Sequence, residues 1–168
     1  MRKLFCTGLV LAQRQHWREA AIVYRASADL DPLCVWHLNN LSWMAATSTE
    51  PRVRDGRYAV VLAVKACEIS GWGCSSFLGT LAAAFARAGD FQRAAAWQRI
   101  CLKLSPPERS NEEAERLRQF EAGEAYTDLR VRTQDEDKTT KAAIAQIDIA
   151  QLLSRAEELI GPSHRILQ

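Results

Sequence analysis

The chain has 168 residues, of which 48% are hydrophobic and 25% charged, a composition typical of a soluble domain that buries a core. Lys and Arg number 22 and Asp and Glu number 20, so the formal charge is +2, and the two signs are interspersed along the sequence. This pattern excludes the dense basic stripe expected for nucleic acid or an acidic membrane, and no apolar run reaches the ~18 residues of a transmembrane helix.

The cysteines and the N-terminal residues bear on the compartment. Five cysteines are an odd number, unevenly spaced, and several fall inside predicted helices, which favours reduced, buried thiols and a cytoplasmic protein. Residues 1–12 offer an alternative, because the basic start Met1-Arg2-Lys3 precedes the apolar run LFCTGLVLA, as in a signal peptide that would export the chain. The run is short and no A-x-A cleavage site stands out, so we expect a cytoplasmic location.

In chain order, two units of paired helices are predicted first, at about residues 1–34 and 35–73. The second unit begins with VWHLNNLSWMAAT and continues with RYAVVLAVKACEIS, and the segment STEPRVRDG between them predicts an enlarged turn. The β-branched run at residues 58–64 would also suit a buried strand. Alanines at helical spacing, Ala59, Ala63 and Ala66, favour a helix there instead.

The clearest predicted unit is the helical hairpin of residues 75–108. Ser75 or Ser76 is expected to cap its first helix, and Gly89-Asp90 separates that helix from a second one, which the prolines after Leu104 stop. Ala82 and Ala94 are expected at the contact, because side chains this small let two helix axes approach to roughly 8–10 Å.

The remaining residues predict a capping helix, a linker and a tail helix. Ser110 and Glu113 have the spacing of a capping box at the start of a polar helix, at about residues 110–122, which Gly123 ends. Residues 127–138 are polar and read as a linker. Residues 139–160 carry apolar residues at alternating spacings of three and four, which predicts a helix that packs on another helix. Folding back on the other helices, homodimerisation and an additional partner site are its alternative roles.

Two of the units share spaced landmarks. Gly8, Ala20, Tyr24, Ser27 and Pro32 have the same spacings as Ala82, Ala94, Gln98, Cys101 and Pro106. With segments such as NNLSWMAAT and FLGTLAAAFARAGDF, this pattern resembles a bacterial subgroup of the tetratricopeptide repeat family over residues 1–126. Gln98 departs from the aromatic residue that the family prefers, so its contact is expected to be wetter or to be made by Trp97.

The resemblance implies an all-α, right-handed solenoid of antiparallel helix pairs, and a noncatalytic module that binds a peptide or a partner helix. In such repeats the first helix of each unit lines the concave groove. The partner-binding residues implied in this way are Phe5, Leu9, Gln13, Trp36, Asn39, Asn40, Trp43 and Arg87. The asparagine amides can both donate to and accept from the backbone of a ligand, and the tryptophans can supply aromatic contact area at an interface. Packing of the tryptophans in the core is an equally weighted alternative.

Two other function classes are weighed against this interpretation. A self-assembling structural protein would use the 139–160 helix to fill the groove or to dimerise. A metal-dependent enzyme would use Cys34 and His37, but no second ligand pair, G-x-S-x-G motif or acid dyad accompanies them. We therefore expect no cofactor and no catalysis, and an unidentified protein or peptide as the partner.

Overall fold

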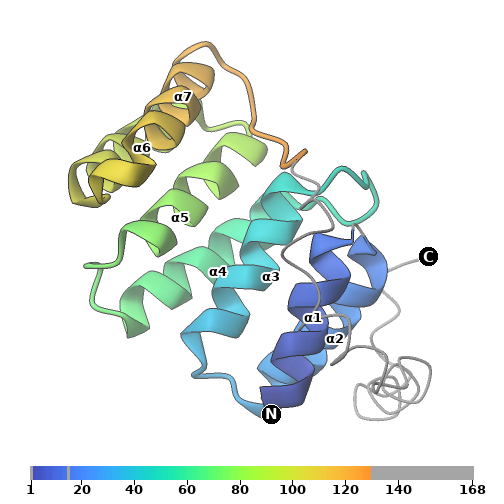
Figure 1. Ribbon diagram of the computed structural model, residues 1–168. Coiled ribbons are helices and arrows are strands. Elements are labelled where there is room, and N and C mark those ends of the chain that lie inside the picture. The colour runs from blue at the N-terminus through green and yellow to red at the C-terminus, as the bar shows by residue number, and fades with distance from the viewer. Residues whose placement is uncertain (1, 15, 130–168) are drawn as a thin grey trace. The chain divides into compact units, whose positions relative to one another are not determined.

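The computed structural model describes residues 2–14 and 16–129, and this part of the chain is helical without a strand (Figure 1). The α-helices are α1 (Arg2–Gln13), α2 (Trp17–Leu30), α3 (Val35–Thr47), α4 (Gly56–Ile69), α5 (Ser75–Arg87), α6 (Phe91–Leu104) and α7 (Ser110–Glu121). One turn of 3-10 helix, η1 (Pro107–Arg109), precedes α7. None of the helices in the described ranges is long and apolar enough to span a bilayer. The tail helix predicted at residues 139–160, and the linker from residue 130, lie outside the described residues.

The described helices fall into two compact units, which are treated separately. The first contains α1 and α2, and the second runs from Leu33 to Asp128 and contains α3 to α7. In the first unit, a Cβ atom on Gly8 would lie 2.8 Å from the ring of Tyr24, and Ala20 is fully buried. The small and aromatic landmarks of the sequence therefore meet where α1 packs against α2.

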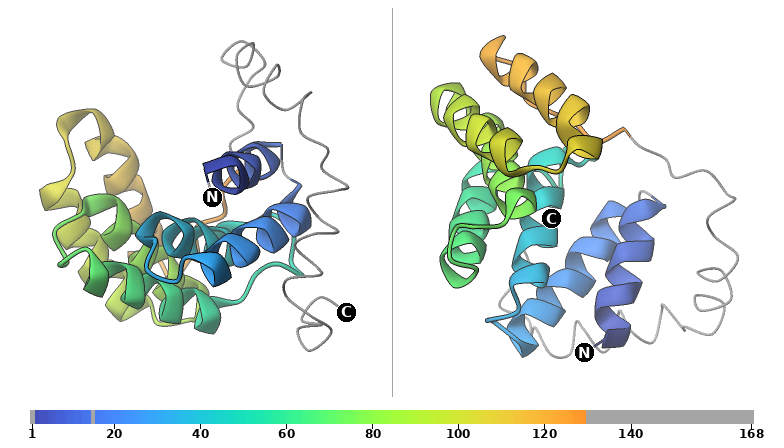
Figure 2. Two further views of the ribbon diagram at one scale, coloured as in Figure 1. Left: turned by 90° about the horizontal axis from the view of Figure 1, so that it is seen from below. Right: turned by 60° about the vertical axis from the view of Figure 1, so that its left-hand side comes forward.

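In the second unit, each helix packs against the next in sequence, and α3 also packs against α5 (Figure 2). The central element is α5, which contacts α3, α4 and α6 and is buried at every residue from Phe77 to Ala86. Ala82 and Ala94 have no exposed surface, as expected for the α5–α6 contact. The run at residues 58–64 is helical, which confirms the choice of helix over strand.

The connections in this unit explain where the helices begin and end. Residues 48–55 form the enlarged turn before α4, and the Asp55 side chain accepts a hydrogen bond from the Tyr58 N–H to cap that helix. Gly71 (φ 69°) and Trp72 (φ 62°) follow α4 in the left-handed region, and the Trp72 ring stacks on Trp97 with centroids 5.3 Å apart. Gly123, with φ 76°, ends α7 as predicted.

Two capping predictions were wrong. The residue before α5 is Cys74, and Ser75 and Ser76 lie inside the helix, where neither caps it. A turn of 3-10 helix leads into α7, so the expected capping box does not form: the Ser110 hydroxyl donates to the Pro106 carbonyl, and Glu113 turns inward. In both places a side chain of the predicted cap makes a tertiary contact instead: Ser76 Oγ accepts a hydrogen bond from Arg109 at 2.9 Å, and Glu113 forms a buried ion pair.

Candidate partner-binding face

Four of the predicted binding residues share one side of α3. Trp36, Asn39 or Asn40, and Trp43 follow one another at helical spacing, which places them on one face. Together with Arg87 of α5 they define what we call the α3–α5 face. Arg87, at the end of α5, lies next to the end of α3, because its Nε donates a 2.6 Å hydrogen bond to the Ala46 carbonyl.

The two ends of this face differ in exposure. Trp36 is 52% exposed, and its ring meets the buried Phe77 ring edge-on, with centroids 5.0 Å apart. Asn39 is buried and its Nδ2 donates to Asn40 Oδ1 at 3.4 Å, while its own Oδ1 accepts no hydrogen bond from a described residue. Trp36 is thus an accessible aromatic group, with a buried amide oxygen on the same side of α3.

The other end of the face holds a segment of the same chain. Residues 124–128, which we call the strap, follow α7 without regular secondary structure. The Asp128 N–H donates a 2.8 Å hydrogen bond to the Thr47 carbonyl, and the Trp43 indole Nε1 donates to Asp128 Oδ2 at 3.1 Å. The Trp43 ring also packs against Tyr126, with centroids 5.8 Å apart. Trp43 therefore contacts a non-helical segment of its own chain.

Arg87 holds the strap through its main chain. Its Nη2 donates to the Tyr126 carbonyl at 2.9 Å and to Thr127 Oγ1 at 3.1 Å. Burial, and after it the charge of Arg54, lowers the pKa of Arg87 below its usual value. The guanidinium nevertheless stays charged at neutral pH, because arginine does not deprotonate there. It acts as a fixed cationic donor on this face.

A further arginine, Arg116, which the sequence analysis did not single out, also contacts the strap. The Arg116 guanidinium of α7 lies over the rings of Trp43 and Tyr126, 5.4 and 5.5 Å from their centroids. Its Nη2 makes ion pairs of 2.8 Å with Glu113 and 3.3 Å with Glu112. The sequence predicts a polar helix here, in which an arginine would be exposed, whereas Arg116 is 3% exposed.

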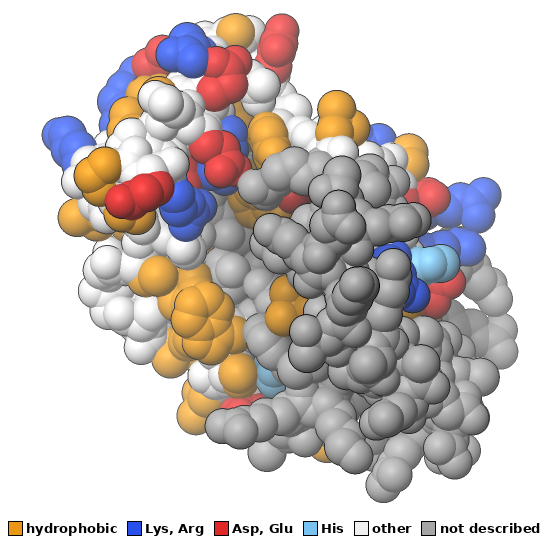
Figure 3. Space-filling view, viewed as in Figure 1, with side chains coloured by type: hydrophobic (Ala, Val, Ile, Leu, Met, Phe, Trp, Pro, Cys, Tyr) orange, Lys and Arg blue, Asp and Glu red, His pale blue; other side chains and the backbone are white. Residues whose placement is uncertain are grey.

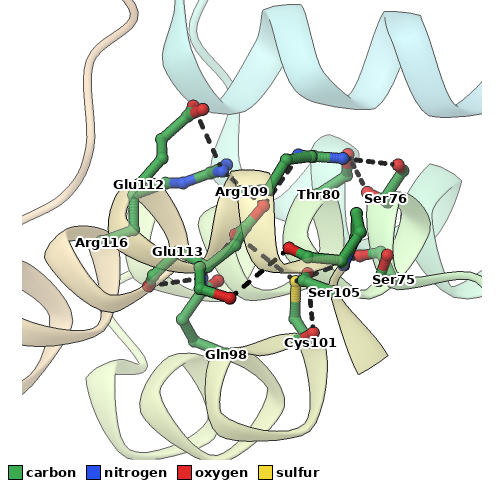
Figure 4. Close-up of polar contacts among 12 residues, drawn as sticks. Ser75, Ser76, Thr80, Gln98, Cys101, Ser105, Arg109, Glu112, Glu113 and Arg116 are labelled. Atoms are coloured by element: carbon green, nitrogen blue, oxygen red, sulfur yellow. Dashed lines mark hydrogen bonds and ion pairs between the residues drawn. The ribbon is translucent and has the colours of Figure 1, made fainter. Parts of the chain in front are cut away.

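Beneath Arg116 lies a buried polar cluster centred on Glu113, which has no exposed surface (Figure 4). Its Oε1 also pairs with Arg109 at 2.7 Å, and its Oε2 accepts hydrogen bonds from Gln98 Nε2 at 2.8 Å and Cys101 Sγ at 3.4 Å. Of the two alternatives predicted at Gln98, a wetter contact or one made by Trp97, the first does not agree with its fully buried side chain, and Trp97 stacks on Trp72. Burial, followed by the charge of Glu113, raises the pKa of Cys101 to about 11, so this thiol remains protonated.

Acidic and basic side chains are mixed over part of the described surface. On the visible face, acidic and basic side chains alternate over α6 and α7 (Figure 3), where Arg99 pairs with Glu121 at 2.5 Å and Arg118 pairs with Glu115. In residues 2–14 and 16–129, no group of three or more His, Cys, Asp or Glu side chains could hold a metal ion. Cys34 is half-buried and His37 buried, and no such group includes them.

The predicted groove residues of α1 belong to the other unit. Leu9 is half-buried there, and the side chains of Phe5 and Gln13 lie outside the described part of the structure. The structure therefore brings together Trp36, Asn39, Asn40, Trp43 and Arg87 within the Leu33–Asp128 unit. No protein-family model matches the chain, and no curated protein matches it.

Proposed function

We propose that the chain is a noncatalytic protein–protein interaction module, a helical solenoid of the tetratricopeptide repeat type, whose α3–α5 face binds a polypeptide of a partner protein. The observation that carries the proposal is the strap: side chains of α3, α5 and α7 hold a non-helical segment of chain on this face. A surface that contacts main chain and side chains of one such segment has the donors and acceptors needed for another.

The open end of the face supports the same function. Trp36 is largely exposed although it is large and apolar, and aromatic residues of this kind supply much of the binding energy at protein interfaces. The free thiols of the described cysteines, Cys34, Cys67, Cys74 and Cys101, are in keeping with a reducing compartment, and we place the protein in the cytoplasm.

Affinity capture with the full chain tests this function. We expect Trp36→Ala to lose specific partners, because it removes the accessible aromatic group of the face. Val61→Ala is the matched control, since Val61 is 65% exposed on α4 and not on this face. Quantitative mass spectrometry of the captured proteins should show losses with Trp36→Ala alone. An unchanged set of partners, with native helical content, would count against the α3–α5 face as the binding site.

A further inference from the structure

We propose that the strap end of the α3–α5 face recognises polypeptides with an aromatic residue two positions before an acidic residue, and that Tyr126 and Asp128 occupy this site internally until such a partner displaces them. This inference rests on the proposed function and adds the chemistry of the partner. It follows from how the face holds each part of the strap.

The aromatic position is built from a cation and a ring. Tyr126 lies between the Arg116 guanidinium and the Trp43 indole, 5.5 and 5.8 Å from its ring centroid. Arg116 is almost completely buried and forms an ion pair with Glu113, so the position of its guanidinium beside the Tyr126 ring is fixed. A flat aromatic side chain suits it, because both neighbours interact favourably with a ring.

The acidic position is two residues further on. The Trp43 indole can only donate a hydrogen bond, and it donates to Asp128 Oδ2 at 3.1 Å. A carboxylate is the stronger acceptor for such a donor, and the positive charge of Arg87, which binds the same segment, favours a negative ligand. The site therefore prefers Asp over its neutral amide.

Two contacts hold the main chain of the segment. The Arg87 Nη2 donates to the Tyr126 carbonyl, and the Thr47 carbonyl accepts the Asp128 N–H. Contacts of this type can hold the main chain of any peptide. The same Nη2 also donates to Thr127 Oγ1 at 3.1 Å, so a hydroxyl side chain between the aromatic and acidic positions adds one further contact.

The strap is attached mainly through side chains and makes few backbone hydrogen bonds. Two backbone–backbone hydrogen bonds join it to the described helices, one at each end, from Glu124 to Gln119 and from Asp128 to Thr47, and Leu129 beyond it is exposed. Segments with few such bonds open at low free-energy cost. Opening leaves the Trp43 N–H and the Arg87 guanidinium without these acceptors, so the vacated face retains its affinity for a similar segment.

The test measures binding of a labelled peptide, EAYTDLR, to the full chain by fluorescence anisotropy. This peptide copies residues 124–130. The variant Tyr126→Ala/Asp128→Ala, which weakens the strap, should bind it at least about ten-fold more tightly than the unaltered chain, because a tethered segment competes at an effective concentration of about millimolar. Circular dichroism should show that the variant keeps its helices. A folded variant that does not bind the peptide would overturn the proposal.

Two matched changes locate the peptide. In the strap-weakened chain, Trp43→Phe should reduce the affinity about ten-fold or more, because it removes the donor to a charged acceptor but keeps a ring. Trp97→Phe, at a tryptophan stacked on Trp72 away from this face, should leave the affinity unchanged. The strap-weakened chain that keeps Trp43 should bind a peptide with asparagine in place of the aspartate less tightly than it binds EAYTDLR. Equal affinities of the two peptides would refute the acidic position.

Peptide binding, affinity capture and light scattering together distinguish a failure of this inference from a failure of the proposed function. They also detect exchange of the strap between two copies of the chain. If the peptide fails to bind while Trp36→Ala still loses captured partners, the partner chemistry is wrong and the interaction function stands. Light scattering should show the same mass for the unaltered chain and for Asp128→Asn. A dimer that is lost on Asp128→Asn would show that a second copy supplies the occupant, and would overturn the displacement by a partner.

Discussion

Glu113 links the core of the Leu33–Asp128 unit to the face that holds the strap. Its carboxylate pairs with Arg116, and Arg116 in turn lies over the rings of Trp43 and Tyr126. A buried ion pair of this kind adds little net stability compared with an apolar pair, but the loss of one partner leaves the other charge buried and uncompensated. The cluster thus fixes the position of Arg116 more than it strengthens the fold.

Glu113→Gln should lower the free energy of unfolding by about 3 kcal/mol, because the buried Arg116 then loses its closer, fully buried charged partner and keeps only the longer pair with Glu112. Urea denaturation followed by circular dichroism measures this difference. Glu115→Gln is the control on the same helix: Glu115 is 56% exposed and pairs with the exposed Arg118, so its removal should cost less than about 1 kcal/mol. Equal losses from the two substitutions would show that burial does not govern the contribution of Glu113.

The sequence did not predict this cluster, and the reason is physical. Ser110 and Glu113 have capping-box spacing, which is a local signal, whereas the contacts of Glu113 with Gln98 and Cys101 depend on how α7 packs against α6. The one available hint was Gln98, an amide at a position where the repeat pattern places an aromatic residue. A buried amide needs a polar partner, and no partner could be assigned before the helices were placed in space.

At the scale of elements, the periodicity of the sequence predicted the helices. It did not predict that residues 124–128 lie on the α3–α5 face. Alanines at helical spacing were sufficient to predict α4, and the break at Gly89-Asp90 with the prolines after Leu104 was sufficient to separate α5 from α6. Residues 124–128 have no periodicity and sit next to a polar segment. Their attachment depends on Trp43, Arg87 and Arg116, which come from three different helices.

The start of α4 contains a close approach that provides a second prediction. A Cβ atom on Gly56 would lie 2.5 Å from the backbone nitrogen of Ala88, just after α5, and 2.6 Å from the carbonyl carbon of Arg87. Gly56→Ala should therefore lower the free energy of unfolding by about 1–3 kcal/mol, because backbone must shift to relieve the overlap. Urea denaturation measures the loss.

Gly73→Ala is the matched control for this substitution. A Cβ atom at Gly73 has no atom within 4 Å, so the change in stability should stay within about 0.5 kcal/mol. Because Arg87 also holds the strap, Gly56→Ala should in addition weaken the strap's attachment. A Gly56→Ala chain as stable as the Gly73→Ala chain would mean that α4 and α5 do not approach so closely.

At the scale of the whole molecule, the hydrophobic core determines which part of the chain can fold by itself. The main cluster of buried residues extends from Ala45 to Phe120, and Ala125 and Tyr126 of the strap pack against it. All of these residues belong to the Leu33–Asp128 unit. The helices are consecutive and contact their sequence neighbours, so most of the contacts are local and favour rapid folding.

We therefore expect a chain shortened to residues 33–129 to fold without the remainder. It should retain a helical circular dichroism spectrum and unfold in one cooperative urea transition, as a domain of about 100 residues with its own core does. The same shortened chain with Asp128→Asn should unfold at only slightly lower urea, because the strap covers the face rather than forming the core. A broad, non-cooperative transition in the unsubstituted fragment would show that the core requires residues outside this unit.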